Sequence, residues 1–357
     1  MNTTLEDISK GSELKEQWDQ LKEKKPKLRT KNAADELGVS EAELVACICD
    51  GETVVRLTED WEGIIKEVET LGKVMALTRN KSAVHEKHGT YQNISFEGHA
   101  GLVLDENIDL RVFHNRWGFA FAVPVENPRG TLYSLQFFDK AGTAVHKIYL
   151  MDEERVGKYS KLVEKFRSDD QSNEIAVKDS IKEKKTVTID EIDTDEFLQK
   201  WSELKDTHDF FPLLRTFKAG RTDALRLAEG RFSWKISNNA TRKMLEWSSE
   251  NVVPIMVFVS SPGMIQIHSG PINRIKVMDH WLNVLDPDFN LHLREDHIAE
   301  SWIVEKPTED GIVTALEIYD EGHNAIATFF GSRKPGKPEL QSWREITSQL
   351  KQMEVEV

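Results

Sequence analysis

Hydrophobic and polar positions along the chain form two matching series. Residues 14–22 (LKEQWDQLK) and 197–205 (FLQKWSELK) both place apolar side chains at i, i+4 and i+7, the spacing of one face of an amphipathic helix. Residues 132–139 (LYSLQFFD) and 313–320 (VTALEIYD) alternate instead, which is the period of a half-buried strand. A turn and a second strand follow, Ala144 to Leu150 and Ala325 to Phe330. Each half is therefore predicted to hold a hairpin, with Gly142 or Gly322 where the turn requires a positive φ.

Other stretches extend the match between the two series. Residues 108–113 (IDLRVF) correspond to 289–294 (FNLHLR), and a C-terminal helix from Glu339 to Gln352 corresponds to residues 154–166. The pattern predicts an α+β fold made by tandem duplication, in which each half packs helices on a large antiparallel β-sheet. We expect an N-terminal repeat at 1–170, a polar, charge-rich linker at 171–190 and a C-terminal repeat at 191–357.

Composition narrows the classes of protein that fit this pattern. With 47 basic and 61 acidic residues in 357, the formal charge is −14, so nucleic acid and anionic membranes should repel the chain. The first residues lack the apolar segment of a secretory signal, and no apolar run approaches the length of a membrane span. Cys47 and Cys49 suit neither a disulfide framework nor a zinc site. We expect a cytoplasmic protein that is not embedded in a membrane.

Residues 30–50 have the spacing of a helix-turn-helix, with Gly38 at the turn. The second helix would carry Glu41, Glu43 and Asp50 and no cation, which opposes the phosphate contacts that supply most nucleic-acid affinity. Ordinary helix packing is the favoured interpretation, although the basic tract at 22–29 keeps a DNA-binding alternative open. The sequence contains no phosphate-binding glycine loop and no hydrolase motif.

One chemical difference separates the two helices that match. The apolar stripe of residues 197–204 continues to His208, whereas the matched position in the first half is Lys25. Phe210 and Phe211 follow the histidine, and Pro212 predicts that the helix ends at Phe211. An imidazole flanked by aromatic rings is a reasonable ligand for a flat, apolar metal complex. A satisfied core or capping histidine is the alternative.

Several cations could serve an anionic ligand. Arg111 shares a strand face with Phe113 and Asp109, so it either lines a pocket for a charged aromatic ligand or forms an exposed ion pair with Asp109. The second half contributes other cations near apolar stretches, namely Arg215, Arg221, Lys306 and Arg333. Guanidinium groups suit carboxylates such as propionates, and solvated surface residues are the alternative.

Taken together, these residues resemble the bacterial hemin-degrading factor family, the cytoplasmic haem-utilisation proteins of the HemS/ChuS type. The resemblance covers nearly the whole chain outside the linker and both tails. The stretches that carry it are 29–40 (RTKNAADELGVS), 76–80 (ALTRN), 85–87 (HEK), 108–111 (IDLR), 205–211 (KDTHDFF) and 302–307 (WIVEKP).

The resemblance implies that one haem b binds between the two halves. It makes His208 the proximal ligand of the haem iron and Arg111 the distal arginine, with Phe113 on the porphyrin face. Arg221, Lys306 and Arg333 match cations that hold propionates or close the pocket. The chain departs from the family at Thr328 and Phe330, where relatives carry glutamine and tyrosine. Two polar contacts to haem are thereby lost.

The family implies two functions, and the residues do not decide between them. In the first, the protein degrades haem oxidatively and releases iron: Arg111 is catalytic, donating a hydrogen bond to the oxygen ligand, and an external donor supplies electrons. In the second, it carries or stores haem and delivers it to a separate haem oxygenase. A haem ABC transporter is a candidate partner in both. A DNA-binding regulator is the third class.

Overall fold

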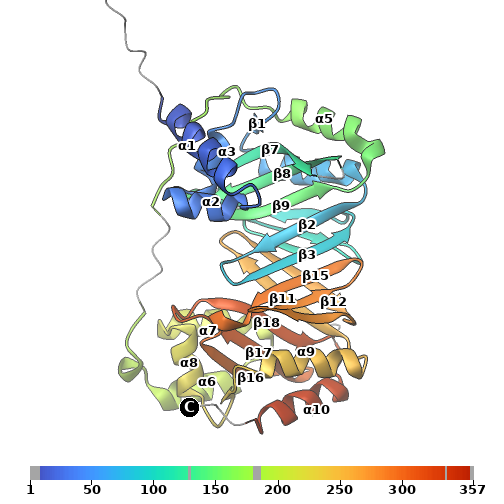
Figure 1. Cartoon of the computed structure of the whole chain (residues 1–357). Helices are drawn as coiled ribbons and strands as arrows, with labels where there is room; N and C mark the ends of the chain where they lie inside the picture. Colours follow the sequence, from blue (N-terminus) through green and yellow to red (C-terminus); the bar gives the residue numbers. More distant parts are fainter. Residues whose placement is uncertain (1–8, 128–129, 180–185, 334–335, 354–357) are drawn as a thin grey trace, which may run out of the picture. The chain divides into compact units, whose positions relative to one another are not determined.

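The computed structural model describes residues 9–127, 130–179, 186–333 and 336–353. It combines helices with two large antiparallel sheets, which confirms the predicted fold class (Figure 1). The described residues fall into two compact units, and each unit includes a short stretch from the other half of the sequence. Unit 1 consists of 1–78, 88–182 and 261–265, and unit 2 of 79–87, 183–260 and 266–357. Residues 180–185 of the predicted linker lie outside the described residues.

Unit 1 places its helices before and after its strands. The helices are α1 (Lys10–Lys24), α2 (Thr30–Leu37), α3 (Glu41–Ala46), α4 (Trp61–Glu67) and α5 (Val156–Lys165), with 3-10 turns η1 (Val68–Leu71), η2 (His114–Arg116) and η3 (Glu153–Arg155). The strands run in the order β1 (Val55–Arg56), β7 (Trp117–Asn127), β8 (Gly130–Asp139), β9 (Ala144–Leu150), β2 (Val74–Arg79), and separately β4 (Ser95–Glu97), β5 (Ala100–Leu104), β6 (Asp109–Val112).

Unit 2 repeats this plan. Its helices are α6 (Thr194–Ser202), α7 (Phe210–Phe217), α8 (Arg221–Leu227), α9 (Ala240–Glu250) and α10 (Gln341–Leu350), with η4 (Ile189–Glu191), η5 (Thr207–Asp209) and η6 (Glu295–His297). The strands are β10 (Ser233–Ile236), β16 (Glu300–Thr308), β17 (Gly311–Tyr319), β18 (Ala325–Gly331), β11 (Ile255–Ser261), β12 (Met264–Gly270), and β3 (Ala83–Gly89), β15 (Phe289–Arg294), β14 (Trp281–Leu285), β13 (Ile275–Met278). The ends of β2, β3, β11 and β12 cross the unit boundaries.

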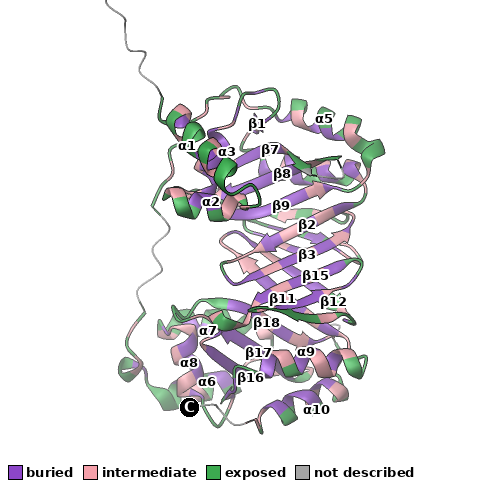
Figure 2. Cartoon of the chain, in the orientation of Figure 1, coloured by how far each residue is buried: buried purple, intermediate pink, exposed green. Residues whose placement is uncertain are grey.

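The strands supply most of the buried surface, whereas the helices are exposed on one side (Figure 2). In unit 1 the last helix is anchored by Tyr159, whose hydroxyl donates to the Ser134 carbonyl at 2.9 Å. In unit 2 the indole of Trp343 donates to the Thr314 carbonyl, also at 2.9 Å. Both aromatic side chains are buried, so α5 and α10 pack on β8 and β17 in the same way. Among the described residues, no helix is long and apolar enough to cross a bilayer.

The two hairpins occur where the alternation predicts them, but the turn glycines differ. Gly142 has the expected positive φ of 79°. In the second turn the positive φ belongs to His323, at 61°, and not to Gly322, so the prediction for Gly322 is wrong. The two turns match by position, because Gly142 and His323 are each the fourth residue counted from Asp139 or Asp320. Histidine is one of the residues that tolerate this region better than most.

The helix-turn-helix spacing produces packed helices. Gly38 ends α2 in the left-handed conformation, and Ser40 begins α3 with a capping box to Glu43. The segment that would read DNA is buried, Leu44 completely. Buried Glu41 accepts a hydrogen bond from Lys147 at 2.6 Å. Cys47 and Cys49 are buried free thiols.

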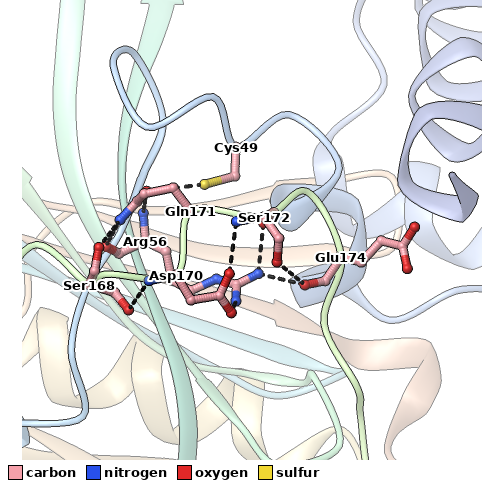
Figure 3. Close-up of polar contacts among 7 residues, drawn as sticks. All are labelled: Cys49, Arg56, Ser168, Asp170, Gln171, Ser172 and Glu174. Carbon is pink, nitrogen blue, oxygen red and sulfur yellow. Dashed lines mark hydrogen bonds and ion pairs between the residues drawn. The ribbon is translucent and has the colours of Figure 1, made fainter.

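The first part of the predicted linker packs against unit 1 (Figure 3). Arg56 forms an ion pair with Asp170 and donates to the carbonyl oxygens of Ser172 and Glu174 at 2.8 and 2.6 Å. Gln171 exchanges hydrogen bonds with the backbone of Arg56 and accepts one from the thiol of Cys49. Its polar composition predicts that this segment is surrounded by solvent. In the structure Arg56 binds the segment instead, by donating to its backbone carbonyl oxygens.

Unit 1 also buries a neutral histidine. His146 is bonded through Nδ1 to the Thr78 hydroxyl at 2.8 Å and through Nε2 to the Tyr91 hydroxyl at 2.6 Å. Burial lowers the pKa of His146 from 6.5 to about 3. The unfolded chain therefore takes up a proton that the folded chain refuses. The resulting contribution to stability is complete above pH 6.5 and is lost as the pH falls toward 3.

We therefore expect His146→Gln to flatten the acid side of the stability profile. Between these two pKa values, uptake of one proton on unfolding gives the free energy of unfolding a slope of up to about 1.4 kcal/mol per pH unit. We expect the variant to lose this part of the slope. Urea unfolding at a series of pH values measures this slope. The exposed His280→Gln variant is the matched control. A wild-type slope in His146→Gln would contradict the assignment.

Candidate functional site

His208 lies on the short turn η5 between α6 and α7. The predicted helix does not reach it, because α6 ends at Ser202 and Asp206 starts a new turn as its N-cap. The prediction that a helix ends at Phe211 is also wrong, because Phe211 and Pro212 lie in the first turn of α7. Proline fits there, since the N–H that it lacks would have no partner within the helix.

The imidazole of His208 is exposed, and Asp206 holds its Nδ1 atom. Its side chain is 93% exposed, and its Nδ1 atom lies 2.5 Å from Oδ1 of Asp206. The same oxygen accepts the backbone N–H of His208 at 2.8 Å. That backbone hydrogen bond, reinforced by the ring and by Arg333, lowers the pKa of Asp206. Because Nδ1 is engaged, Nε2 is the nitrogen left to bind a metal.

The two aromatic residues after His208 have different positions. Phe210 is buried and contacts Trp201 edge-to-face with ring centroids 4.4 Å apart. Phe211 is 62% exposed, with the guanidinium of Arg215 5.2 Å from its ring centroid. Phe210 thus anchors the segment in the core of unit 2, while Phe211 offers an apolar surface close to His208 in the chain.

Two of the predicted cations meet at one buried carboxylate, Glu317 on β17. Arg221 donates to Glu317 through Nε at 3.0 Å and Nη2 at 2.5 Å, and Lys306 donates to it at 3.2 Å. The hydroxyl of Tyr319 donates to Glu317 at 2.5 Å. Both cations also lie over the ring of Phe210, at 4.8 and 4.9 Å from its centroid.

Lys306 and Glu317 are buried, at 4% and 1% exposed, whereas the side chain of Arg221 is 31% exposed. Burial works to raise the pKa of Glu317, but Arg221 and Lys306 outweigh it and hold the pKa well below the usual range. Burial lowers the pKa of Lys306 to about 8, although Glu317 opposes this shift. Two cations share one carboxylate, so the cluster has an excess of positive charge.

Phe330 and Arg333 lie near the end of β18. Phe330 is partly buried and contacts Phe258 edge-to-face at 5.2 Å, and the ammonium of Lys306 is 6.0 Å from its ring centroid. Arg333 pairs with Asp310 at 3.5 Å. Thr328 stands opposite Glu317 in the ladder. Phe330 therefore belongs to the surroundings of Lys306, while Arg333 lies close enough to Asp206 to affect its pKa.

Arg111 and Phe113 belong to unit 1. Arg111 lies on β6, a strand whose other face is buried through Leu110, and it forms an ion pair with Asp109. Burial raises the pKa of Asp109 in spite of this pair. Phe113 is 37% exposed. Phe113 follows the end of β6, as the residue before η2, so no shared strand face is observed for it and Arg111. Both alternatives from the sequence remain open, because Arg111 is paired with Asp109 and Phe113 is a partly exposed ring two residues further along the chain.

Sequence reasoning missed Leu102 on this face. It stands opposite Arg111 in the antiparallel pair of β5 and β6, and it is 37% exposed. Directly opposite residues share a face of the sheet, so Leu102 adds apolar surface next to the arginine. Alternation along 100–104 indicates an exposed face, but the pairing with Arg111 needs the strand register.

In unit 2 the structure groups Arg221 and Lys306 around Glu317 and Phe210, with Phe330 beside Lys306, while Arg333 pairs with Asp310. This donor set fits haem. The porphyrin supplies four nitrogen ligands, so the protein needs to add only one imidazole with a free nitrogen. His208 meets that requirement by exposure and by the engagement of Nδ1.

Comparison with known proteins gives the same family for both halves. The family described as "Haemin-degrading HemS.ChuX domain" matches residues 38–166 and again residues 218–350. The second match repeats the first, which confirms the predicted duplication.

Relatives align along almost the entire chain. The hemin transport protein HmuS of Yersinia pestis is 35% identical over 341 residues, which cover 95% of this chain and 98% of HmuS. The hemin transport protein HemS of Yersinia enterocolitica is 34% identical over 345 residues, with the same two shares.

Two solved structures have the same fold over similar lengths. Holo-PhuS, a heme-binding protein from Pseudomonas aeruginosa, is 42% identical with a TM-score of 0.93, covering 96% of this chain and 99% of its own. ChuS, a heme-degrading enzyme of Escherichia coli O157:H7, is 33% identical with a TM-score of 0.87, covering 95% and 99%.

The Glu317 cluster yields a stability prediction. Glu317→Ala leaves the buried Lys306 and the partly buried Arg221 without their carboxylate, so the free energy of unfolding should fall by about 3–5 kcal/mol. Urea unfolding measures the loss. Glu246→Ala removes a surface partner of Lys243 and should cost less than about 1 kcal/mol. Equal losses in the two variants would show that the two cations do not depend on Glu317.

Proposed function

Because this chain belongs to the haemin-degrading HemS/ChuX family, as its motifs predict, we propose that it binds haem and serves in haem utilisation. His208 is the iron ligand, and one haem binds per chain. Support comes from the family match in both halves and from relatives that are named for hemin transport, heme binding and heme degradation.

The exposed imidazole of His208 is the observation that carries this proposal. The core histidine His146, in contrast, is buried with both ring nitrogens bonded. His208 is 93% exposed, and Asp206 engages only its Nδ1 atom. Nearby, Phe211 offers exposed apolar surface, and the Glu317 cluster offers an excess of positive charge for propionates.

Oxidative degradation is the first form of this function. Bound haem supplies the iron that activates oxygen, and the external reductant supplies electrons. The residue proposed to act in catalysis is Arg111, which stands opposite the exposed Leu102 in the pair of β5 and β6. A preorganised donor of this kind stabilises negative charge that develops on a neighbouring oxygen.

Haem carriage to a separate oxygenase is the second form. The pairing of Arg333 favours it, since this proposed propionate-binding cation is paired with Asp310. A propionate would compete with this carboxylate, so binding would be readily reversible. A haem transporter or an oxygenase would then be the partner.

Replacing the proposed iron ligand tests both forms. We expect wild-type protein to saturate near one haem per chain in a Soret titration and to give a histidine-ligated spectrum. His208→Ala should lose that spectrum, because the imidazole is the proposed bond to iron. His280→Ala, at another exposed histidine of unit 2, should titrate like wild type. An unchanged coordination spectrum in His208→Ala would sink the proposal.

Arg111→Ala separates degradation from carriage. On the degradation hypothesis the variant binds haem normally but turns it over roughly 10²-fold more slowly, the order of loss for one preorganised donor. Product formation with a chemical or enzymatic reductant measures the rate, and Arg155→Ala at an exposed site of unit 1 is the control. Equal turnover of wild type and Arg111→Ala would refute the catalytic role. Carriage is supported instead if wild type forms no product but transfers haem to an added oxygenase faster than haem dissociates.

A further inference from the structure

The carboxylate of Asp206 serves the backbone and the ring of His208 through one oxygen atom. Oδ1 accepts the backbone N–H of His208 at 2.8 Å and lies 2.5 Å from its Nδ1. An ordinary ion pair on the surface joins two side chains only, whereas this carboxylate is also bonded to the backbone. The backbone bond fixes the carboxylate, and the fixed carboxylate then fixes the direction of the imidazole.

The segment that carries Asp206 is itself held in place. Asp209 accepts the backbone N–H groups of Lys205 and Asp206 at 3.3 and 3.0 Å. The next residue, Phe210, is buried against Trp201. The turn is therefore closed on itself by two carboxylates and anchored by one aromatic ring. Among the residues that the structure describes, Asp206 contacts the imidazole, whereas Asp209 accepts backbone N–H groups.

A carboxylate bonded to one ring nitrogen changes the other nitrogen. It keeps the proton on Nδ1 and leaves the lone pair on Nε2, which is the atom that would face a metal. It also draws the Nδ1 proton toward itself, which makes Nε2 a stronger electron donor. A backbone carbonyl or water at the same position would fix the tautomer but carry no negative charge.

We propose that Asp206 is a positioning residue for the iron ligand: it fixes the His208 tautomer and strengthens electron donation from Nε2 to haem iron, which favours ferric over ferrous haem. This inference rests on the proposed function of His208. It concerns the quality of the iron bond, so it applies equally to degradation and to carriage.

The test compares variants that separate the charge of Asp206 from its capping role. Asp206→Asn keeps an oxygen acceptor of the same length but removes the charge. Asp206→Ser keeps a side chain that caps helix N-termini well but also lacks the charge. Asp209→Asn is the matched control. It perturbs the same turn, because Asp209 accepts two backbone N–H groups there, but it does not alter the contact between Asp206 and the ring. His208→Ala tests the iron ligand itself.

Full-length protein loaded with haem is examined by resonance Raman spectroscopy of the ferrous form and by spectroelectrochemistry. Both Asp206 variants should keep one haem per chain with histidine ligation. Their iron–histidine stretch should move to lower frequency, and their midpoint potential should become more positive than that of wild type. Asp209→Asn should match wild type in both measurements.

Wild-type frequency and potential in both Asp206 variants would overturn the inference. So would an equal shift in Asp209→Asn, because order of the turn rather than the charge would then be responsible. Loss of histidine ligation in the Asp206 variants, with recovery in Asp206→Glu, supports the positioning role. These failures differ from a failure of the proposed function, which is signalled by an unchanged spectrum in His208→Ala.

Discussion

The candidate site of unit 2 depends on the ion pairs that Glu317 forms with two cations. Glu317 lies on β17, and it is shared by Lys306 from the neighbouring strand β16 and by Arg221 from the first turn of α8. Burying either cation alone would be costly, because a charge removed from water needs a partner with good geometry. The shared carboxylate allows Lys306 to be buried and Arg221 to be partly buried. Their positions over the ring of Phe210 then set the start of α7, directly after the turn that presents His208.

Duplication supplies two similar scaffolds, and the site arises where they differ. Both repeats anchor their last helix by an aromatic donor on a strand carbonyl, Tyr159 in one and Trp343 in the other. These contacts bury side chains, so their chemistry has to be retained for the fold. The loop after the first helix of each repeat is exposed and has no such requirement. There the first repeat pairs Lys25 with Glu36, whereas the second has Asp206 and His208. Chemistry can diverge at loops because the sheet beneath them keeps its shape.

Periodicity was sufficient for the strands and hairpins, because alternation is a local property that the buried face of a sheet enforces. It failed at the ends of elements. His323 takes the left-handed turn position that the glycine rule gives to Gly322, and Pro212 lies inside α7 rather than after it. Both failures have the same origin. Glycine favours a positive φ and proline favours the end of a helix, but the exact position of the residue within the turn or the first helical turn decides whether that preference applies.

Site residues were predictable by type but not by partner. The cations Arg221 and Lys306 could be proposed from their chemistry, yet nothing local identifies Glu317, which is 96 residues from Arg221. The same holds for Arg56, whose partners Ser172 and Glu174 lie in a segment that composition alone describes as a linker. Long-range pairing of this kind depends on strand register, which a single sequence specifies only through the completed fold.

The pairing of the cations bears on how a haem would be held. Of the cations proposed for the propionates, Arg221 and Lys306 share Glu317, while Arg333 is paired with Asp310. A propionate that binds such a cation replaces one ion pair by another, so the net electrostatic gain is small. Phe330 contributes a ring that has no hydroxyl to donate. Affinity would then come mainly from apolar contact with the porphyrin and from the bond between His208 and iron. A site of this kind selects haem by its metal and its flat surface, and it can release haem without separating a strong ion pair.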